Sequence, residues 1–184
     1  MALYDELEGY REYLGLLGRI QLDDRLAGKV DVSGVVQVTM LEASQNAEQW
    51  KSLDKESRIA WLRRLFSHNL LDEIRKFRAQ ARDVRREQPL DAAIEQSASR
   101  LDVWLAAEQS SPSQKIIRSE EALRLAAALG RLTAPQREAI ELYHLRGIPL
   151  AEVALQMDRE KAAIAALIFR GTKRLREILA QSEE

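Results

Sequence analysis

The stretch Leu132 to Arg176, LTAPQREAIELYHLRGIPLAEVALQMDREKAAIAALIFRGTKRLR, decides the fold of the C-terminal part of this chain. Its apolar residues recur every three to four positions in three blocks, which is typical of amphipathic helices. Gly147 and Pro149 separate the first block from the second, since both residues interrupt helices. A short helix between two turns, followed by a long basic helix, predicts a helix-turn-helix unit.

Local signals predict where these helices begin and which faces they bury. Thr133 and Gln136 have the spacing of a capping box, and Pro135 falls in the first turn, where its missing N–H costs little. The next helix is expected to begin near Leu150, and Asp158 is expected to cap the last one. The expected buried stripe of the last helix consists of Ile164, Leu167, Ile168, Leu175, Ile178 and Leu179.

The same helical periodicity runs through nearly the whole chain, and no stretch alternates like a strand, so we predict an all-α fold. A helix capped by Ser33 is expected to bury one apolar face. That face consists of Val32, Val35, Val36, Thr39, Met40 and Ala43. From Ser57 onward, the pattern predicts either one long amphipathic helix or two helices broken near residues 67–69.

The chain is expected to divide into two small helical domains. Pro89 disfavours helix at Gln88, so the basic helix should end there. Ser110 to Gln114, SSPSQ, is typical of a flexible segment. We therefore predict domains over residues 1–88 and 115–184, joined by a flexible acidic linker over residues 89–114.

Charge is distributed in blocks, although 28 Lys and Arg against 29 Asp and Glu give a net charge of only −1. Residues 58–86 and 159–176 are basic, whereas residues 87–121 are acidic, which indicates separate surfaces for different partners. The chain has no cysteine, which excludes disulfides and a thiol nucleophile. It shows no signal-peptide core and no apolar run of membrane-spanning length, so we expect a soluble, cytoplasmic protein that does not enter a membrane.

No pattern in the sequence predicts an enzyme. His68 and His144 are isolated, and no glycine-rich phosphate loop is present. Acid pairs such as Glu138 with Glu141, and Glu120 with Glu121, are interpreted as ordinary charges on helix surfaces. We therefore expect no catalytic residue, metal site or cofactor.

The basic C-terminal helix offers two groups of candidate DNA contacts. Arg159, Glu160 and Lys161 stand at its leading end, where such helices meet base edges in the major groove. The residues suited to phosphates are Arg170, Lys173, Arg174 and Arg176. An ordinary amphipathic helix with a solvated basic face is the alternative, and the preceding turn, short helix and capping box favour the DNA-binding interpretation.

The upstream basic helix is a second candidate nucleic-acid surface. Its side chains are candidates for following a single strand, and Trp61 could stack on an unpaired base. These candidates are Trp61, Arg64, Asn69, Asp72, Arg75 and Lys76. A core position for Trp61 is favoured over base stacking, and Trp50 and Trp104 are interpreted as core or linker anchors.

Three segments in order resemble the two-domain bacterial RNA polymerase sigma factors of the extracytoplasmic-function type. Residues 35–43, VVQVTMLEA, resemble the family's "LVQETFLxA" helix. Residues 60–72 resemble "TWLxxIAxNxxxD", and residues 132–176 resemble "LPxxxREAxxLxxxxGxxxxEIAxxM". The resemblance covers nearly the whole chain.

The resemblance implies a promoter-specificity subunit with no catalysis of its own. Val36, Gln37, Met40 and Leu41 would bind the β′ clamp helices of core RNA polymerase. The upstream basic helix would melt and hold the −10 element, with a strand-capturing loop near Trp50 to Ser57. The last helix would read the −35 element, and its domain would touch the β flap, while the acidic linker would thread the polymerase.

The sequence departs from the family pattern in the segment that would bind polymerase and in the helix that would read the −35 element. Val38 stands where an acid is common, and Gly34 stands where an Asp often precedes the motif. Ala165, Ala166 and Leu167 occupy positions where relatives often carry Arg and Ser, which moves the expected base readout to Arg159 and Lys161.

The sequence is also compatible with two other functions. One is a free-standing helix-turn-helix regulator that does not bind polymerase, which Val38 and Gly34 favour. The other is a helical adaptor whose basic faces bind acidic partners. The sequence leaves open whether an anti-sigma factor exists.

Overall fold

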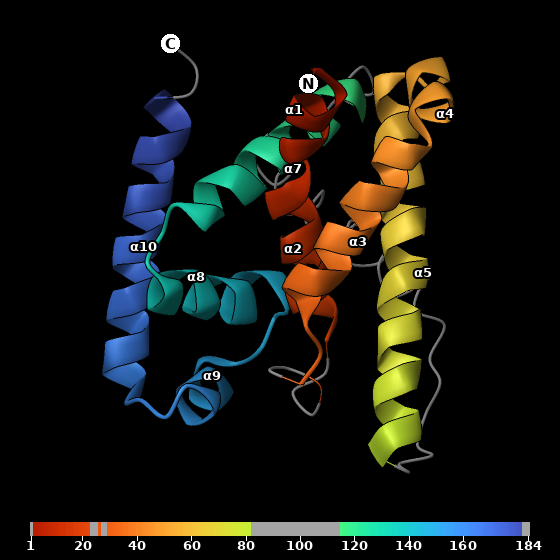
Figure 1. The fold of residues 1–184 in the computed structure, drawn as a ribbon. Helices are drawn as coiled ribbons and strands as arrows, with labels where there is room; N and C mark the ends of the chain where they lie inside the picture. The colour runs from red at the N-terminus through yellow and green to blue at the C-terminus, as the bar shows by residue number, and fades with distance from the viewer. Residues whose placement is uncertain (1, 23–25, 27–28, 82–114, 182–184) are drawn as a thin grey trace.

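Every element in the described part of the chain is a helix, as the sequence predicts (Figure 1). The computed structural model describes residues 2–22, 26, 29–81 and 115–181. The helices are α1 (Ala2–Glu8), α2 (Arg11–Gln21), α3 (Val32–Gln45), α4 (Ala47–Ser52), α5 (Lys55–Ala81), α7 (Lys115–Gly130), α8 (Ala134–Ile140), the π-helical turn η2 (Glu141–Leu145), α9 (Leu150–Gln156) and α10 (Lys161–Gln181). The predicted linker over residues 89–114 lies outside the described residues. No helix in the described ranges combines the length and apolar character needed to cross a membrane.

Helix α3 buries the face predicted for it, but its cap differs from the prediction. Val36, Met40 and Ala43 are buried against α2 and α5. The predicted cap, Ser33, lies inside the helix. Asp31 caps it instead, because its Oδ1 accepts a hydrogen bond from the Gly34 N–H at 3.0 Å.

Helix α5 is one continuous helix of 27 residues, so the alternative with a break near residues 67–69 is wrong. The polar residues there have partners that leave the helix intact. The Ser67 hydroxyl donates to the Arg63 carbonyl at 2.7 Å, and the Asn69 amide donates to the Thr39 hydroxyl on α3 at 3.2 Å. No glycine or proline occurs between Lys55 and Ala81.

The C-terminal helices form the predicted helix-turn-helix. Thr133 and Gln136 make the capping box of α8, in which the Thr133 N–H donates to Gln136 Oε1 at 3.4 Å. Val153 and Ile164 anchor a small core shared by α8, α9 and α10. Helix α10 crosses α8 closely at Gly171, where an added Cβ would stand 2.8 Å from a methyl carbon of Ile140.

Asp158 ends α9 and does not cap α10, so that part of the prediction is wrong. Its φ of 49° is left-handed. The Asp158 N–H donates to the Leu155 carbonyl at 3.3 Å, and the Arg159 N–H donates to the Ala154 carbonyl at 2.9 Å. These two bonds make a Schellman motif, in which aspartate occupies the place usually taken by glycine.

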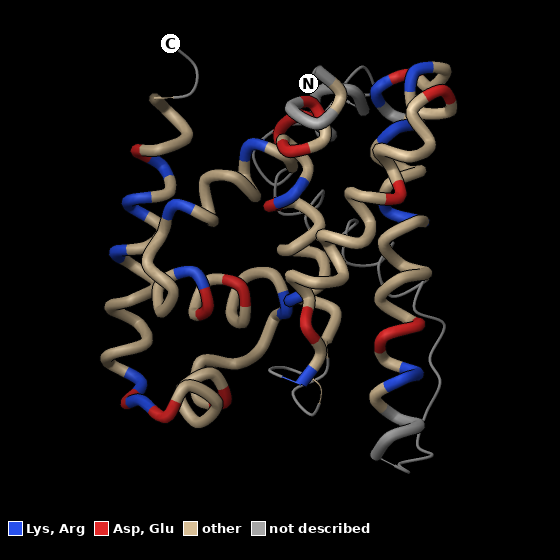
Figure 2. Tube along the Cα trace, in the orientation of Figure 1, with Lys and Arg blue, Asp and Glu red and all other residues tan. Residues whose placement is uncertain are grey.

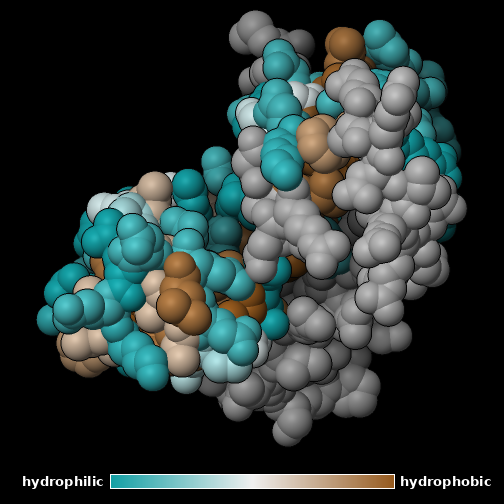
Figure 3. Space-filling model, turned by 90° about the horizontal axis from the view of Figure 1, so that it is seen from below, coloured by the Kyte–Doolittle hydropathy of each residue, from teal (hydrophilic) through white to brown (hydrophobic). Residues whose placement is uncertain are grey.

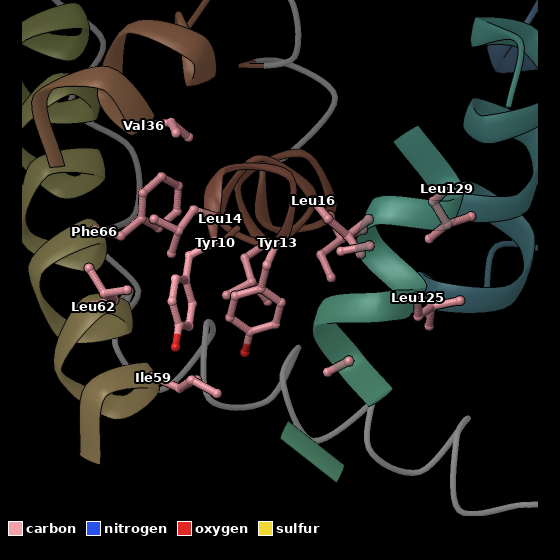
Figure 4. Close-up of a cluster of buried hydrophobic side chains, with 14 of the residues drawn as sticks. Tyr10, Tyr13, Leu14, Leu16, Val36, Ile59, Leu62, Phe66, Leu125 and Leu129 are labelled. Atoms are coloured by element: carbon pink, nitrogen blue, oxygen red, sulfur yellow. The ribbon is translucent and has the colours of Figure 1, made fainter. Parts of the chain in front are cut away.

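One hydrophobic core runs through both ends of the chain. We call α1–α5 the N-terminal half and α7–α10 the C-terminal half. Figure 4 shows α2 between the two, with Phe66 and Leu62 of α5 on one side and Leu125 and Leu129 of α7 on the other. Helix α2 therefore contributes to a core that spans both halves.

Candidate nucleic-acid interface

The leading end of α10 presents the three predicted base-reading residues to solvent. Arg159, Glu160 and Lys161 are all exposed, and they follow directly on the Schellman turn. The turn fixes the backbone immediately before the helix, so these side chains project from a defined position. One carboxylate lies between two cations, an arrangement that can donate to guanine and accept from cytosine.

The outer side of α10 continues this surface with cations. Arg170, Lys173 and Arg174 are exposed, and Lys and Arg recur along the side of α10 away from α7 and α8 (Figure 2). Arg174 pairs with Glu177 at 3.1 Å. An exposed pair of this kind contributes little energy, so Arg174 can exchange it for a phosphate at small cost.

Small and apolar side chains fill the rest of this face. Ala162 and Ala165 are exposed, so a DNA backbone can approach α10 closely there. Phe169 is 73% exposed and Leu155 of α9 is 81% exposed. The surface at this end of the molecule is mainly hydrophilic with small hydrophobic areas (Figure 3).

On α5, four of the six predicted contact residues face solvent. Arg64, Asp72, Arg75 and Lys76 are exposed. Arg75 pairs with Asp72 at 3.5 Å, and Lys76 pairs with Glu73 at the same distance. Both pairs are local and solvated, so these cations remain available to an anionic strand.

The other two residues on α5 have structural partners. Trp61 is half-buried, with its ring centroid 6.1 Å from that of Trp50, in agreement with its preferred interpretation as a core residue. The Asn69 amide donates to Glu42 Oε2 at 2.9 Å as well as to Thr39, which ties α5 to α3. Neither side chain is presented freely to a ligand.

The segment Trp50 to Ser57, where a strand-capturing loop is expected, is mostly helical, although Lys51, Ser52, Asp54 and Lys55 are exposed. Helix α4 ends at Ser52 and α5 begins at Lys55, so only two residues lie between the helices. Trp50 is fully buried and its indole N–H donates to Glu6 Oε2 at 3.1 Å. Its ring also holds the Arg58 guanidinium, 5.0 Å from the centroid. Aromatic packing makes this corner compact.

The four residues predicted to contact polymerase divide between the two faces of α3. Val36 and Met40 are only 3% exposed and pack inside the N-terminal half. Gln37 and Leu41 face solvent, as does the neighbouring Val38, and Leu41 is 58% exposed. An external partner can therefore reach only the outer face of α3.

Contrary to the sequence prediction, Glu141 does not lie on a helix surface but is buried. It lies in η2 with a side chain only 8% exposed, not on a helix surface. Arg19 of α2 donates to it through a fork, with Nη2 at 2.9 Å from Oε1 and Nε at 3.1 Å from Oε2. Burial raises the pKa of the Glu141 carboxyl, while the hydrogen bond from Arg19 acts in the opposite direction.

A cavity of about 310 Å³ lies beside this ion pair, lined by both halves. Its walls combine apolar groups such as Val30 and Leu142 with the charged groups of Arg19, Arg137 and Glu138. Among the described residues, no cluster of His, Asp and Glu has the make-up of a metal site.

Two comparisons with known proteins agree with this geometry. Residues 122–175 match the family model described as sigma-70, region 4. The chain is also 28% identical, over 99% of its own length and 92% of the relative's, to "ECF RNA polymerase sigma factor SigF" of Caulobacter vibrioides (strain NA1000 / CB15N). The matched region begins within α7 and ends within α10, so it contains the helix-turn-helix. These two similarities support the resemblance in the sequence: residues 122–175 are similar to region 4 of sigma-70, and the whole chain is similar to a sigma factor of the extracytoplasmic-function type.

Proposed function

We propose that this protein binds core RNA polymerase and directs it to promoters by contacting a −10 and a −35 element. The observation that carries the proposal is the presence of two separate exposed cationic surfaces, one on α5 and one on α10. Figure 1 shows these helices on opposite sides of the molecule. A single chain with two such surfaces could contact one DNA molecule at two separate elements.

The C-terminal half would read the −35 element in duplex DNA. Arg159 and Lys161 stand at the end of α10 that would enter the major groove, and Glu160 lies between them. Arg170, Lys173 and Arg174 would hold phosphates along the groove. The same half would contact the β flap of the polymerase.

The N-terminal half would hold the −10 element through the exposed charges of α5. Arg64, Arg75 and Lys76 would attract the strand, and the polar Asp72 would lie among them. Trp61 and Asn69 support this surface from behind, since both are engaged in packing or hydrogen bonds with neighbouring helices.

Core polymerase would dock on the outer face of α3. Gln37, Val38 and Leu41 form this face, and its apolar part suits the β′ clamp helices. Because Val38 brings no charge, the contact would rest on apolar burial more than on ion pairing. No catalytic step is assigned to the protein itself.

The test is co-elution of the full chain with bacterial core polymerase. The variant Gln37→Lys/Leu41→Lys places two charges on the outer face of α3, and Gln49→Lys on α4 is the control, since Gln49 is exposed too. We expect the double variant to lose binding by at least about tenfold, because burying an unpaired charge in an interface is costly. The control should co-elute like the wild type.

Equal co-elution of both variants would refute the α3 docking surface. A wild-type chain that is folded, does not co-elute and still binds one duplex sequence tightly alone would instead be a free-standing regulator. That alternative rests on the uncharged Val38 and on the well-formed helix-turn-helix.

A further inference from the structure

The cavity beside the Arg19–Glu141 pair is walled on one side by a single face of α8 and η2. Residues at the spacing i, i+3, i+4, i+7 and i+8 share one face of a helix. The residues of this wall have that spacing: Ala134, Arg137, Glu138, Glu141 and Leu142. The other lining residues come from the end of α2, the start of α3 and the residue after η2: Arg19, Leu22, Val30, Val32 and Arg146. Segments more than 100 positions apart in the sequence therefore enclose one space.

The size and the apolar part of the lining suit a small molecule. A volume of about 310 Å³ lies at the lower end of the range for ligand sites, roughly 300–1,000 Å³. Leu22, Val30 and Leu142 are buried and give the cavity aliphatic walls. Water bonds poorly to such walls, so an apolar group that displaces it from the cavity gains affinity.

The charged part of the lining favours a ligand with one negative charge. The described lining residues include three arginines and two glutamates, so positive charge exceeds negative charge by one. Arg19 and Glu141 neutralise each other through their hydrogen-bonded fork. A single excess cation in a partly enclosed space attracts a monoanion, because Coulomb interactions are stronger there than in bulk water.

Arg137 is the cation best placed to bind that anion. It is half-buried, and its guanidinium makes no hydrogen bond or salt bridge with another described residue. Burial raises the pKa of the Glu141 carboxyl, whereas Arg19 and Arg137 lower it, so the charge of Arg137 acts inside the cavity. Arg19 and Arg146 are already engaged by other groups. A planar guanidinium with five N–H donors binds a carboxylate through two parallel hydrogen bonds.

We propose that this cavity is a binding site for a small monocarboxylate with an apolar tail. The carboxylate pairs with Arg137, and the tail contacts Leu22, Val30 and Leu142. The site does not depend on the proposed function, since it needs neither polymerase nor DNA. A ligand that binds only the folded chain also stabilises it, in proportion to the logarithm of the ligand concentration once the site is saturated.

The first test uses octanoate as the probe, with the full chain and isothermal titration calorimetry. Octanoate combines one carboxylate with an aliphatic tail. Acetate has the carboxylate without the tail, octanol has the tail without the charge, and inorganic phosphate is an anion without a tail. We expect octanoate to bind at one site and to raise the melting temperature as its concentration increases. Each of the other three compounds should bind at least about tenfold more weakly, because each lacks one half of the recognition.

Three variants locate the site. Arg137→Gln removes the guanidinium, and Ala134→Trp places a large ring at the cavity wall, at a position that is exposed and so tolerates it. Arg131→Gln is the matched control, because Arg131 is exposed and does not line the cavity. Arg137→Gln should weaken octanoate at least about tenfold and leave the weak binding of octanol unchanged, since only octanoate uses the charge. Ala134→Trp should abolish octanoate binding, and Arg131→Gln should bind like the wild type.

Circular dichroism of each variant checks that helix content is unchanged. The proposal is overturned if the wild type does not bind octanoate, if Arg137→Gln binds it as tightly as the wild type does, or if binding does not saturate at one site. Equal affinity for inorganic phosphate and octanoate would overturn it too, because the apolar tail would then contribute nothing. None of these results bears on the proposed function, which is decided by co-elution with polymerase.

Discussion

Asp158 shows how one backbone conformation sets the position of the residues proposed to read DNA. Its left-handed φ of 49° closes α9 and turns the chain toward α10. Aspartate tolerates this conformation better than most residues, whereas a β-branched side chain does not. Arg159 to Lys161 follow immediately, so their placement depends on that single residue.

We expect Asp158→Gly to change the free energy of unfolding by less than about 1 kcal/mol. Glycine adopts the left-handed conformation without the steric cost that aspartate bears, but it loses more backbone entropy on folding, and the two effects offset each other. Asp158→Val should destabilise the chain by about 2 kcal/mol relative to Asp158→Gly. Urea unfolding of both variants measures the difference. Equal stability of the two would show that Asp158 does not hold the left-handed conformation in solution.

Glu141 links the buried contact between the halves to pH. Its carboxyl has a pKa raised above the ordinary value of 4.5 by burial, against the influence of Arg19 and Arg137. The folded state therefore binds a proton more readily than the unfolded state, and this group's contribution to stability grows as pH falls from neutrality toward 4.5. The neighbouring Glu138 raises the pKa further.

We expect the melting temperature of the wild type, relative to that of Glu141→Gln, to rise as pH falls from 7 toward 5. The glutamine variant lacks the titrating group, so subtracting its curve removes the other carboxylates. A melting-temperature difference that is flat with pH, or that falls as pH falls, would contradict the raised pKa.

At the scale of the element, α10 combines two kinds of contact on one helix. Arg159 and Lys161 at its leading end are the proposed base-reading residues, whereas Lys173 lies three turns further along among the proposed phosphate contacts. Base contacts discriminate between sequences, and phosphate contacts do not. The two ends of the helix should therefore respond differently to truncation.

We expect Arg159→Ala and Lys161→Ala each to cost about 1–3 kcal/mol of binding to the preferred −35 sequence and to relax specificity locally. Lys173→Ala should weaken binding to all DNA sequences alike. It should also lower, by about one, the slope of the logarithm of the binding constant against the logarithm of the salt concentration. Fluorescence anisotropy with the polymerase-bound chain on matched and mutated duplexes measures both. If Arg159→Ala weakens every duplex equally, it contacts a phosphate and not a base.

Local periodicity was sufficient to predict the helices, and local signals were less reliable at their ends. The stripe containing Ile164 and Leu175 and the capping box at Thr133 follow from spacing, and both are confirmed. Asp158 was misassigned because aspartate favours both helix caps and left-handed turns. Whether an aspartate caps the next helix or ends the previous one depends on the backbone conformation of its neighbours. The spacing of apolar residues gives no information about that conformation.

The partner of Glu141 could not be predicted for a different reason. Arg19 lies 122 positions away in the sequence, so no local pattern connects the two residues. The π-helical turn that contains Glu141 also departs from the regular helical period used to assign faces. For the same reason, no spacing rule indicates that the α2 face containing Leu16 lies against α7.

At the scale of the whole molecule, the continuous core means that neither half is complete without the other. Leu16 and Tyr13 of α2 lie in the same buried cluster as Leu125 of α7 and Leu175 of α10. The interface is built largely from helix faces that either half alone would present to water. The two halves should therefore behave as complementary fragments.

Two separately produced pieces, residues 1–81 and 115–184, should associate spontaneously and melt together in one transition. A mixture that shows two independent transitions would contradict this. If the pieces reassemble, the connecting residues serve chiefly to raise the local concentration of each half around the other. Cutting that connection would then make association of the two halves depend on protein concentration, so dilution alone would separate the exposed cationic surfaces of α5 and α10.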